Sequence, residues 1–184
     1  MTDSQLEHLL KSSEGWFAAV YLNLCSFSKS GELPGKTSDI YQMFSASMLN
    51  PLPEDRKEFL SAMGLADEFT EEMAEFITKR EDVHQILKML TRQNAFVACL
   101  NHGQTYRFHH MMKECAFRAF RTLDDSRQAF YYERYGAWYE KHGAYIYALS
   151  AYRRNQNFAA ILRVVQKDAG ILLASLNRKR FWKF

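Results

Sequence analysis

The sequence predicts a mainly α fold with a small β-hairpin: a winged helix followed by α-α superhelical, TPR-like helices. Three observations favour this fold class. A short apolar run and an alternating segment flank a turn signal at residues 101–104, where Gly103 can adopt positive φ at little cost. Apolar residues recur at helical spacing on both sides of this hairpin. Beyond residue 123, aromatic-rich segments of helical period are joined by turns at Gly143 and Asn155.

The predicted winged helix covers residues 39–123. Its first helix is followed by a second that Pro53 is suited to begin, and by a third that Thr70 is suited to cap. A fourth helix, the hairpin strands 96–100 and 105–108, and a closing helix complete the domain. The fourth and closing helices have apolar faces at helical spacing: Val83, Ile86, Leu87 and Leu90, and Met112, Cys115, Ala116, Ala119 and Phe120.

Three further segments flank this domain. Residues 1–29 are predicted to be the helical stub of a preceding domain, because the helix from Trp16 is apolar around most of its circumference. Ser, Gly and Pro gather in residues 30–38, which predicts a linker. Residues 124–184 are predicted to begin a helical-repeat domain. The last clear helix there has a predicted inward face of Phe158, Ala159, Ile161, Leu162 and Val165.

The composition limits the functional classes. With 47% hydrophobic residues the chain can build a core, and its net charge of +3 is too small to indicate nucleic-acid binding by itself. Its three widely spaced cysteines favour free thiols in a reducing compartment. The N-terminus lacks a signal-sequence pattern, and no apolar run approaches the length of a membrane span. We therefore expect a cytoplasmic protein without a membrane partner.

The residue patterns argue against an enzyme or a metal site. Histidines and cysteines gather around the hairpin, but H-E-x-x-H and C-x-x-C spacings are absent from the sequence, so no metal ligands are predicted. A pair such as Cys115 and His109 has no accompanying oxyanion-hole motif. We expect no catalytic residues and no enzymatic activity in this chain.

DNA binding is an alternative function. In a DNA-reading winged helix, the helix before the hairpin enters the major groove. The sequence places donors on the outward positions of that helix and on the wing: His84, Gln85, Lys88, Thr91, Arg92 and Arg107. Acidic residues lie just upstream and would repel phosphates, namely Glu71, Glu72, Glu75, Glu81 and Asp82. A solvated helix face is therefore the favoured interpretation.

Three segments occur in an order that resembles a known family. They are SEGWFAAVYL at 13–22, QNAFVACLNHGQTYRFHHMMKECAFRAF at 93–120 and YGAWYEKHGAYIYALSAYRRNQNFAAIL at 135–162. In these segments the chain resembles the middle of the large ATP-binding LuxR-type transcription regulators, the family of the maltose-regulon activator. That family belongs to the signal-transducing ATPases, which combine a nucleotide-binding domain, a winged helix and a helical-repeat sensor. The resemblance implies that residues 1–29 end the nucleotide-binding domain.

The resemblance also implies nucleotide contacts. In this class, a histidine at the start of the last winged-helix helix reaches the β-phosphate of the nucleotide in the resting form, and His109 matches it. The family usually has proline at the next position, where this chain has His110. Gly15, Trp16 and Phe17 resemble the segment that packs near the adenine, with Phe17 in place of a proline. ADP or ATP would thus be bound by the parent protein, and this chain alone has no cofactor.

The family's other functional motifs are absent from these residues. The sequence lacks a G-x-x-x-x-G-K-[ST] phosphate loop and ends before the family's DNA-reading helix-turn-helix. We therefore expect an internal piece of a bacterial regulator. Its partners would be the preceding nucleotide-binding domain and the following repeats, with DNA bound only by the missing helix-turn-helix. Its role would be to relay signal between nucleotide and sensor. A stand-alone helical scaffold or partner-binding module is the other alternative.

Overall fold

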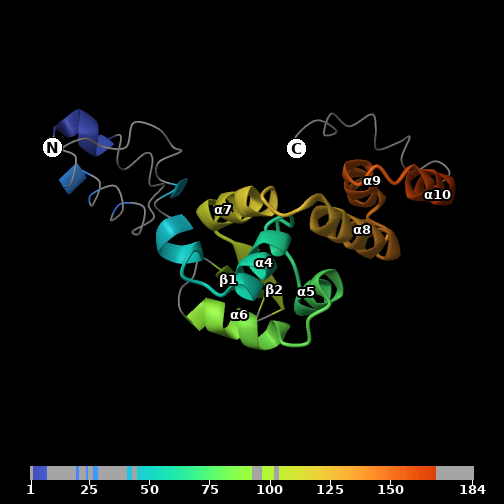
Figure 1. Cartoon of the computed structure of the whole chain (residues 1–184), viewed down its shortest axis with the longest axis horizontal. Helices are drawn as coiled ribbons and strands as arrows, with labels where there is room; N and C mark the ends of the chain where they lie inside the picture. The colour runs from blue at the N-terminus through green and yellow to red at the C-terminus, as the bar shows by residue number, and fades with distance from the viewer. Residues whose placement is uncertain are drawn as a thin grey trace.

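The structure is a computed structural model that describes residues 2–7, 20, 24, 27–28, 41–42, 45–92, 97–101 and 104–168. A π-helical turn, Ser45–Leu49, precedes the regular elements. These are α4 (Glu54–Met63), α5 (Glu71–Thr78), α6 (Val83–Arg92), β1 (Val97–Leu100), β2 (Thr105–Phe108), α7 (His110–Phe120), α8 (Asp125–Lys141), α9 (Tyr145–Arg154) and α10 (Phe158–Asp168). Figure 1 shows α8, α9 and α10 grouped at one side of the other elements.

This order confirms the predicted fold class, a mainly α chain with a small hairpin and further helices after the winged helix. The predicted linker 30–38 and turn residues 102–103 lie outside the described residues, as do most of the predicted stub 1–29 and residues 169–184. The domain boundaries given above therefore remain predictions.

The hairpin is a two-stranded antiparallel sheet in which Val97 lies opposite Phe108 and Leu100 lies opposite Thr105. Phe69, in the connection between α4 and α5, adds one bridge to Tyr106 through hydrogen bonds of 3.0 and 2.8 Å. At the end of β1, Asn101 adopts a left-handed φ of 50°, a conformation that asparagine tolerates better than most residues. Strand β2 is therefore held on one side by β1 and also by the α4–α5 connection.

Thr70 and Asp124 cap the starts of α5 and α8 with their side chains. The Thr70 hydroxyl oxygen accepts a 3.1 Å hydrogen bond from the backbone N–H of Met73, as the sequence predicted. The Asp124 carboxylate accepts a 2.9 Å hydrogen bond from the backbone N–H of Arg127 and begins α8. Because each cap satisfies a backbone donor that the helix itself leaves unpaired, both boundaries follow from local sequence.

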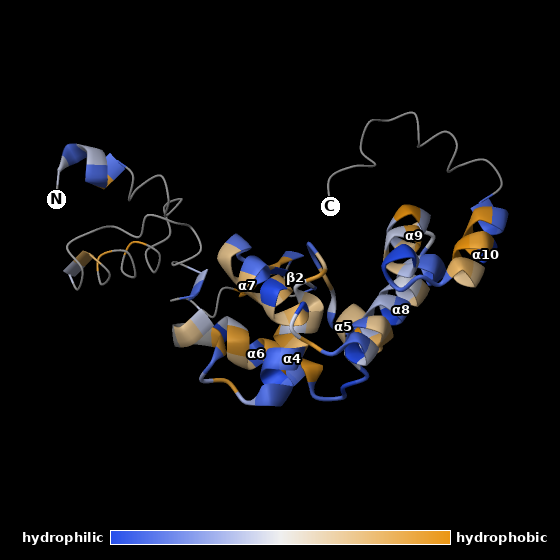
Figure 2. Ribbon diagram, turned by 45° about the horizontal axis from the view of Figure 1, so that its top comes forward, coloured by the Kyte–Doolittle hydropathy of each residue, from blue (hydrophilic) through white to orange (hydrophobic). Residues whose placement is uncertain are grey.

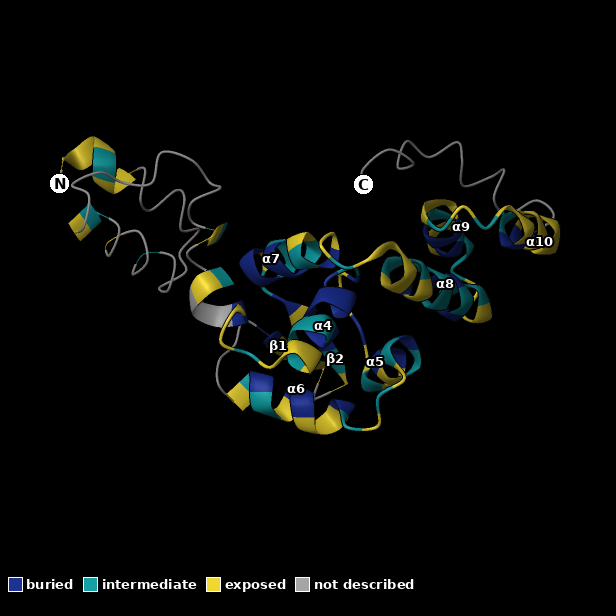
Figure 3. Ribbon diagram, viewed as in Figure 1, coloured by how far each residue is buried: buried dark blue, intermediate teal, exposed yellow. Residues whose placement is uncertain are grey.

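Buried residues of α4, α6 and α7 form the winged-helix core, and Figure 3 shows buried residues in each of these helices. Leu60, Leu87 and Phe120 are each 0% exposed. Gly64 at the end of α4 lies against α7, and a Cβ at that position would lie 2.6 Å from the Cβ of Ala116. The glycine therefore permits a separation between the two helices that any larger residue would prevent.

Helix α8 shares this core. The Tyr135 hydroxyl donates a 2.8 Å hydrogen bond to the Ala62 carbonyl of α4, and both groups are buried. Trp138 packs on Phe76 of α5 with ring centroids 5.4 Å apart. The same apolar cluster contains Phe120 of α7 together with these α8 side chains. The winged helix is thus joined to the helices that follow it by continuous packing across residue 123.

Helices α8, α9 and α10 pack around a second, smaller cluster centred on Tyr152, which is 1% exposed. The Tyr152 ring lies against α8 at Gly136, where an added Cβ would meet ring carbons at 2.4 to 2.7 Å. Ala160 and Val164 of α10 complete this cluster. Small side chains therefore allow the three helices to approach closely.

The predicted inward face of α10 is largely wrong. Phe158, Leu162 and Val165 are 68%, 62% and 48% exposed, and Figures 2 and 3 show apolar and exposed residues along this helix. The buried positions are Ala160, Val164 and Asp168. Of these, Ala160 and Val164 pack with Tyr152, because their small side chains fit against its ring. Periodicity identified a helix with apolar residues around much of its surface, but it did not identify the face that meets the neighbouring helices.

Candidate functional site

His109 lies between the wing and α7. It is the N-cap residue of α7, with φ −57° and ψ 146°, and its side chain is half-buried. Its Nδ1 accepts a hydrogen bond of 3.4 Å from the backbone N–H of Met111. In the neutral ring an accepting Nδ1 places the proton on Nε2, which is then a donor. The α7 N-terminus adds the partial positive charge of its dipole, so the two features together suit an anion.

The ring of His109 lies beside another histidine. Its centroid lies 4.4 Å from that of His110, which is exposed. One turn along α7, Lys113 forms an ion pair with Asp67 of the α4–α5 connection. The predicted adenine segment, Gly15, Trp16 and Phe17, lies outside the described residues. The structure therefore describes His109 as a half-buried ring at the start of α7, and it does not describe the other predicted nucleotide contacts.

The helix that would read DNA has the predicted orientation. Its apolar side is buried, and its opposite side exposes four of the predicted donors: His84, Gln85, Lys88 and Arg92. Thr91 is half-buried, and its hydroxyl donates a 2.8 Å hydrogen bond to the Leu87 carbonyl. Its hydroxyl is thus already used within the helix.

Carboxylates lie beside two of the other predicted DNA contacts. Glu71 lies 3.1 Å from the Nδ1 of His84 and also accepts a 2.8 Å hydrogen bond from the Tyr106 hydroxyl. Burial, and then the hydrogen bond to Glu71, raise the pKa of Tyr106, so the phenol stays neutral. On the wing, Arg107 lies 3.6 Å from Glu68. A DNA backbone that approached these donors would also approach the carboxylates. Their repulsion of the phosphates would weaken DNA binding.

We expect the 184-residue chain not to bind duplex DNA. A fluorescein-labelled random duplex titrated at about 50 mM salt should show no affinity tighter than about 100 μM, the weak end of non-specific binding. Fluorescence anisotropy measures this directly. Tighter, salt-sensitive binding that disappears in Lys88→Glu would establish the DNA-reading alternative instead.

Among the described residues, no group of three or more His, Cys, Asp or Glu side chains is arranged to hold a metal ion. Cys99 is exposed and Cys115 is buried, and both are free thiols. Burial raises the pKa of the Cys115 thiol, which opposes formation of a reactive thiolate. The structure thus offers no activated nucleophile at Cys115.

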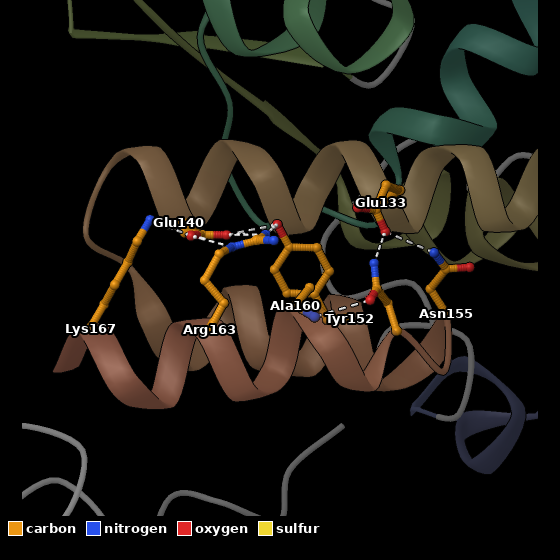
Figure 4. Close-up of polar contacts among 8 residues, drawn as sticks. Glu133, Glu140, Tyr152, Asn155, Ala160, Arg163 and Lys167 are labelled. Atoms are coloured by element: carbon orange, nitrogen blue, oxygen red, sulfur yellow. Dashed lines mark hydrogen bonds and ion pairs between the residues drawn. The ribbon is translucent and has the colours of Figure 1, made fainter. Parts of the chain in front are cut away.

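Sequence reasoning missed a pair of carboxylates on α8, shown in Figure 4. Glu140 accepts hydrogen bonds from Tyr152 of α9 at 2.9 Å and from Arg163 of α10 at 2.8 and 3.1 Å. Lys167, one turn further along α10, lies 2.6 Å from the same carboxylate. The side chain of Glu140 is only 8% exposed, and its hydrogen bonds, above all those from Arg163, lower its pKa to about 2. Glu140 therefore remains ionised and connects three helices.

Glu133 makes a similar connection two turns earlier in α8. One of its oxygens accepts 2.9 Å hydrogen bonds from the side-chain amides of Asn155 and Asn157, and Asn157 also caps α10 at Ala160. One feature of the sequence could have pointed to this pair. The two glutamates are seven residues apart on one helix, which places them on the same face. Their partners are far away in sequence, so spacing alone did not identify them.

Comparison with known proteins gives one family match and one relative. Residues 45–129 match the family described as the MalT winged helix domain. The winged helix resembles that of MalT. Over 153 residues the chain is 22% identical to the HTH-type transcriptional regulator AlkS of Alcanivorax borkumensis. That alignment covers 82% of this chain and 17% of the relative's length.

The matched family is thus a winged helix, and the matched relative is described as a transcriptional regulator. The chain spans 17% of the length of the relative it matches. None of the described helices is both long and apolar enough to cross a membrane.

Proposed function

We propose that this chain is an internal relay of an ATP-dependent LuxR-type transcription regulator. It would couple the nucleotide state of a preceding domain to a helical-repeat sensor that follows, in the cytoplasm of a bacterium. The chain itself would neither hydrolyse ATP nor read DNA. What carries the proposal is the position of His109, a half-buried ring at the N-terminus of α7 beside the wing of a MalT-like winged helix.

The relay would begin at a phosphate. With Nδ1 occupied by the Met111 N–H, His109 would present its Nε2–H to the β-phosphate of ADP bound by the preceding domain. The contact would be stronger than one between neutral groups, because the acceptor is charged and the α7 dipole favours an anion. Gly15, Trp16 and Phe17 would pack near the adenine of the same nucleotide.

The relay would continue through the shared core. Tyr135 and Trp138 attach α8 to α4 and α5, so a displacement of the winged helix displaces α8 with it. An inducer that favours one position of the repeats would then favour one position of His109. The energy of this shift would come from differential binding of ligands elsewhere in the parent protein, with the winged helix and α8 as the coupling element.

The test is a substitution that removes the imidazole without removing the helix cap. In the longer polypeptide that contains the nucleotide-binding domain, His109→Ser should accelerate release of a fluorescent ADP analogue by about tenfold, the effect of losing one hydrogen bond to a charged group. Serine is itself a good N-cap, so the melting temperature should not change. Stopped-flow fluorescence measures the release rate.

The matched control is His84→Ser, which removes a histidine from the exposed face of α6. It should leave ADP release unchanged, and only the His109 variant should raise basal transcription. Equal rates of ADP release from the unsubstituted protein and from His109→Ser would show that His109 does not contact the nucleotide.

A further inference from the structure

A cleft of about 510 Å³ lies between the winged helix and the helices that follow it. One wall is formed by Gly64 and Leu65 at the end of α4 together with Phe117 of α7. The other wall is formed by residues of α8 and α9. Its volume falls within the range of roughly 300 to 1,000 Å³ that small-molecule sites occupy.

Aromatic rings dominate the α8–α9 wall. Tyr135 and Tyr139 lie on α8 with ring centroids 6.0 Å apart, and Tyr147 of α9 continues the row 5.2 Å from Tyr139 at an interplanar angle of 34°. Tyr147 is 49% exposed, although a large ring usually gains from burial. Phe117 of α7 also lines the cleft. A flat aromatic molecule that entered the cleft would cover the exposed surface of these rings.

Among the described residues that line the cleft, one cation lacks a carboxylate partner. Lys113 forms an ion pair with Asp67, and Glu114 forms one with Arg118, so these four charges compensate one another. Arg154, at the end of α9, has no carboxylate partner among the residues that the structure describes. Its guanidinium lies 5.9 Å from the ring centre of Tyr132, which also lines the cleft. An anionic group would therefore be attracted to this end of the aromatic row.

We propose that this cleft binds a small planar aromatic anion, such as an aryl carboxylate. Its ring would lie along Tyr139 and Tyr147, and its carboxylate would pair with Arg154. Because such a molecule would contact α7 on one side and α8 and α9 on the other, it stabilises their packing. This site is separate from the nucleotide contact proposed for His109, and either can be wrong without the other.

Isothermal titration calorimetry of the 184-residue chain with two probes tests the proposal. The first probe is 2-naphthoate, and the second is 2-naphthamide, a neutral molecule of nearly the same shape. The carboxylate should bind at least about tenfold more tightly, as expected for a charge-assisted contact to a guanidinium. The substitution Arg154→Gln should remove this difference, while leaving binding of the amide unchanged.

Matched variants separate the site from general surface effects. Arg153 is exposed in the same last turn of α9 and does not line the cleft, so Arg153→Gln should keep the preference for the carboxylate. Tyr147→Ala should weaken both probes, whereas Phe158→Ala, which removes an exposed ring from α10, should weaken neither. Equal affinities for the two probes, equal effects of the two arginine variants, or no binding at millimolar probe overturns the proposal.

Discussion

The substitution Phe120→Ala is expected to lower the free energy of unfolding by about 3–5 kcal/mol, the range for removing a fully buried aromatic ring. Phe120 is 0% exposed, and its ring lies 5.3 Å from that of Tyr132 and 6.1 Å from that of Tyr131. The cavity would therefore open where α7 meets α8. Urea unfolding followed by circular dichroism measures the loss.

The matched control is Phe158→Ala, the same substitution at a ring that is 68% exposed, which should change stability by less than about 0.5 kcal/mol.

The shared core also predicts a single unfolding transition for the winged helix and α8. Hydrogen exchange in α6 of the winged helix and in α8 should accelerate together in Phe120→Ala. If α8 exchanged faster while α6 kept its protection, the two parts would unfold separately and the core would not be continuous.

The substitution Glu140→Gln is expected to destabilise the α8–α10 packing by about 2–3 kcal/mol near neutral pH. The pKa of Glu140 falls from its ordinary value of 4.5 to about 2, chiefly through the hydrogen bonds from Arg163. A shift of this size corresponds to about 3 kcal/mol, which is reduced because Arg163 and Lys167 are half-exposed and screened by solvent. Urea unfolding of both proteins gives the difference.

The contribution of Glu140 to stability depends on pH, because its pKa is lowered on folding. Because the folded pKa of Glu140 is lower than the unfolded one, its contribution is fully present above about pH 4.5 and is lost as the pH falls toward 2. The stability difference between the protein and Glu140→Gln should thus be constant from pH 7 to pH 5 and shrink below it. Glu54→Gln alters a carboxylate that is 88% exposed beside Lys57 and should show almost no difference. If the stability difference for Glu140→Gln grew on acidification, the ionised carboxylate of Glu140 would not be what stabilises the contact between these helices.

Most of the fold could be predicted because local signals specify it. Thr70 and Asp124 cap helices through contacts three residues away, and the apolar face of α6 follows from its 3.6-residue period. The hairpin was predictable because an apolar run, a turn signal and an alternating run occur in immediate succession. Each of these features depends on neighbours in sequence.

The features that were not predicted depend on distant partners. Val164 is buried and Val165 is exposed, and nothing in the sequence distinguishes them until α10 is placed against Tyr152. Glu140 acquires its low pKa from residues 23 and 27 positions later, and such a connection leaves no local pattern. The cleft beside Tyr139 and Arg154 is likewise formed only when α9 lies near α7.

The attachment of α8 to α4 and α5 has a practical consequence for anyone who trims this gene. A shortened chain that ends after Leu123 would lack Tyr135 and Trp138, which contact Ala62 and Phe76. The isolated winged helix would then expose an apolar surface that favours aggregation. A chain that ends beyond α9 should instead not aggregate, even though the predicted domain boundary lies at residue 123.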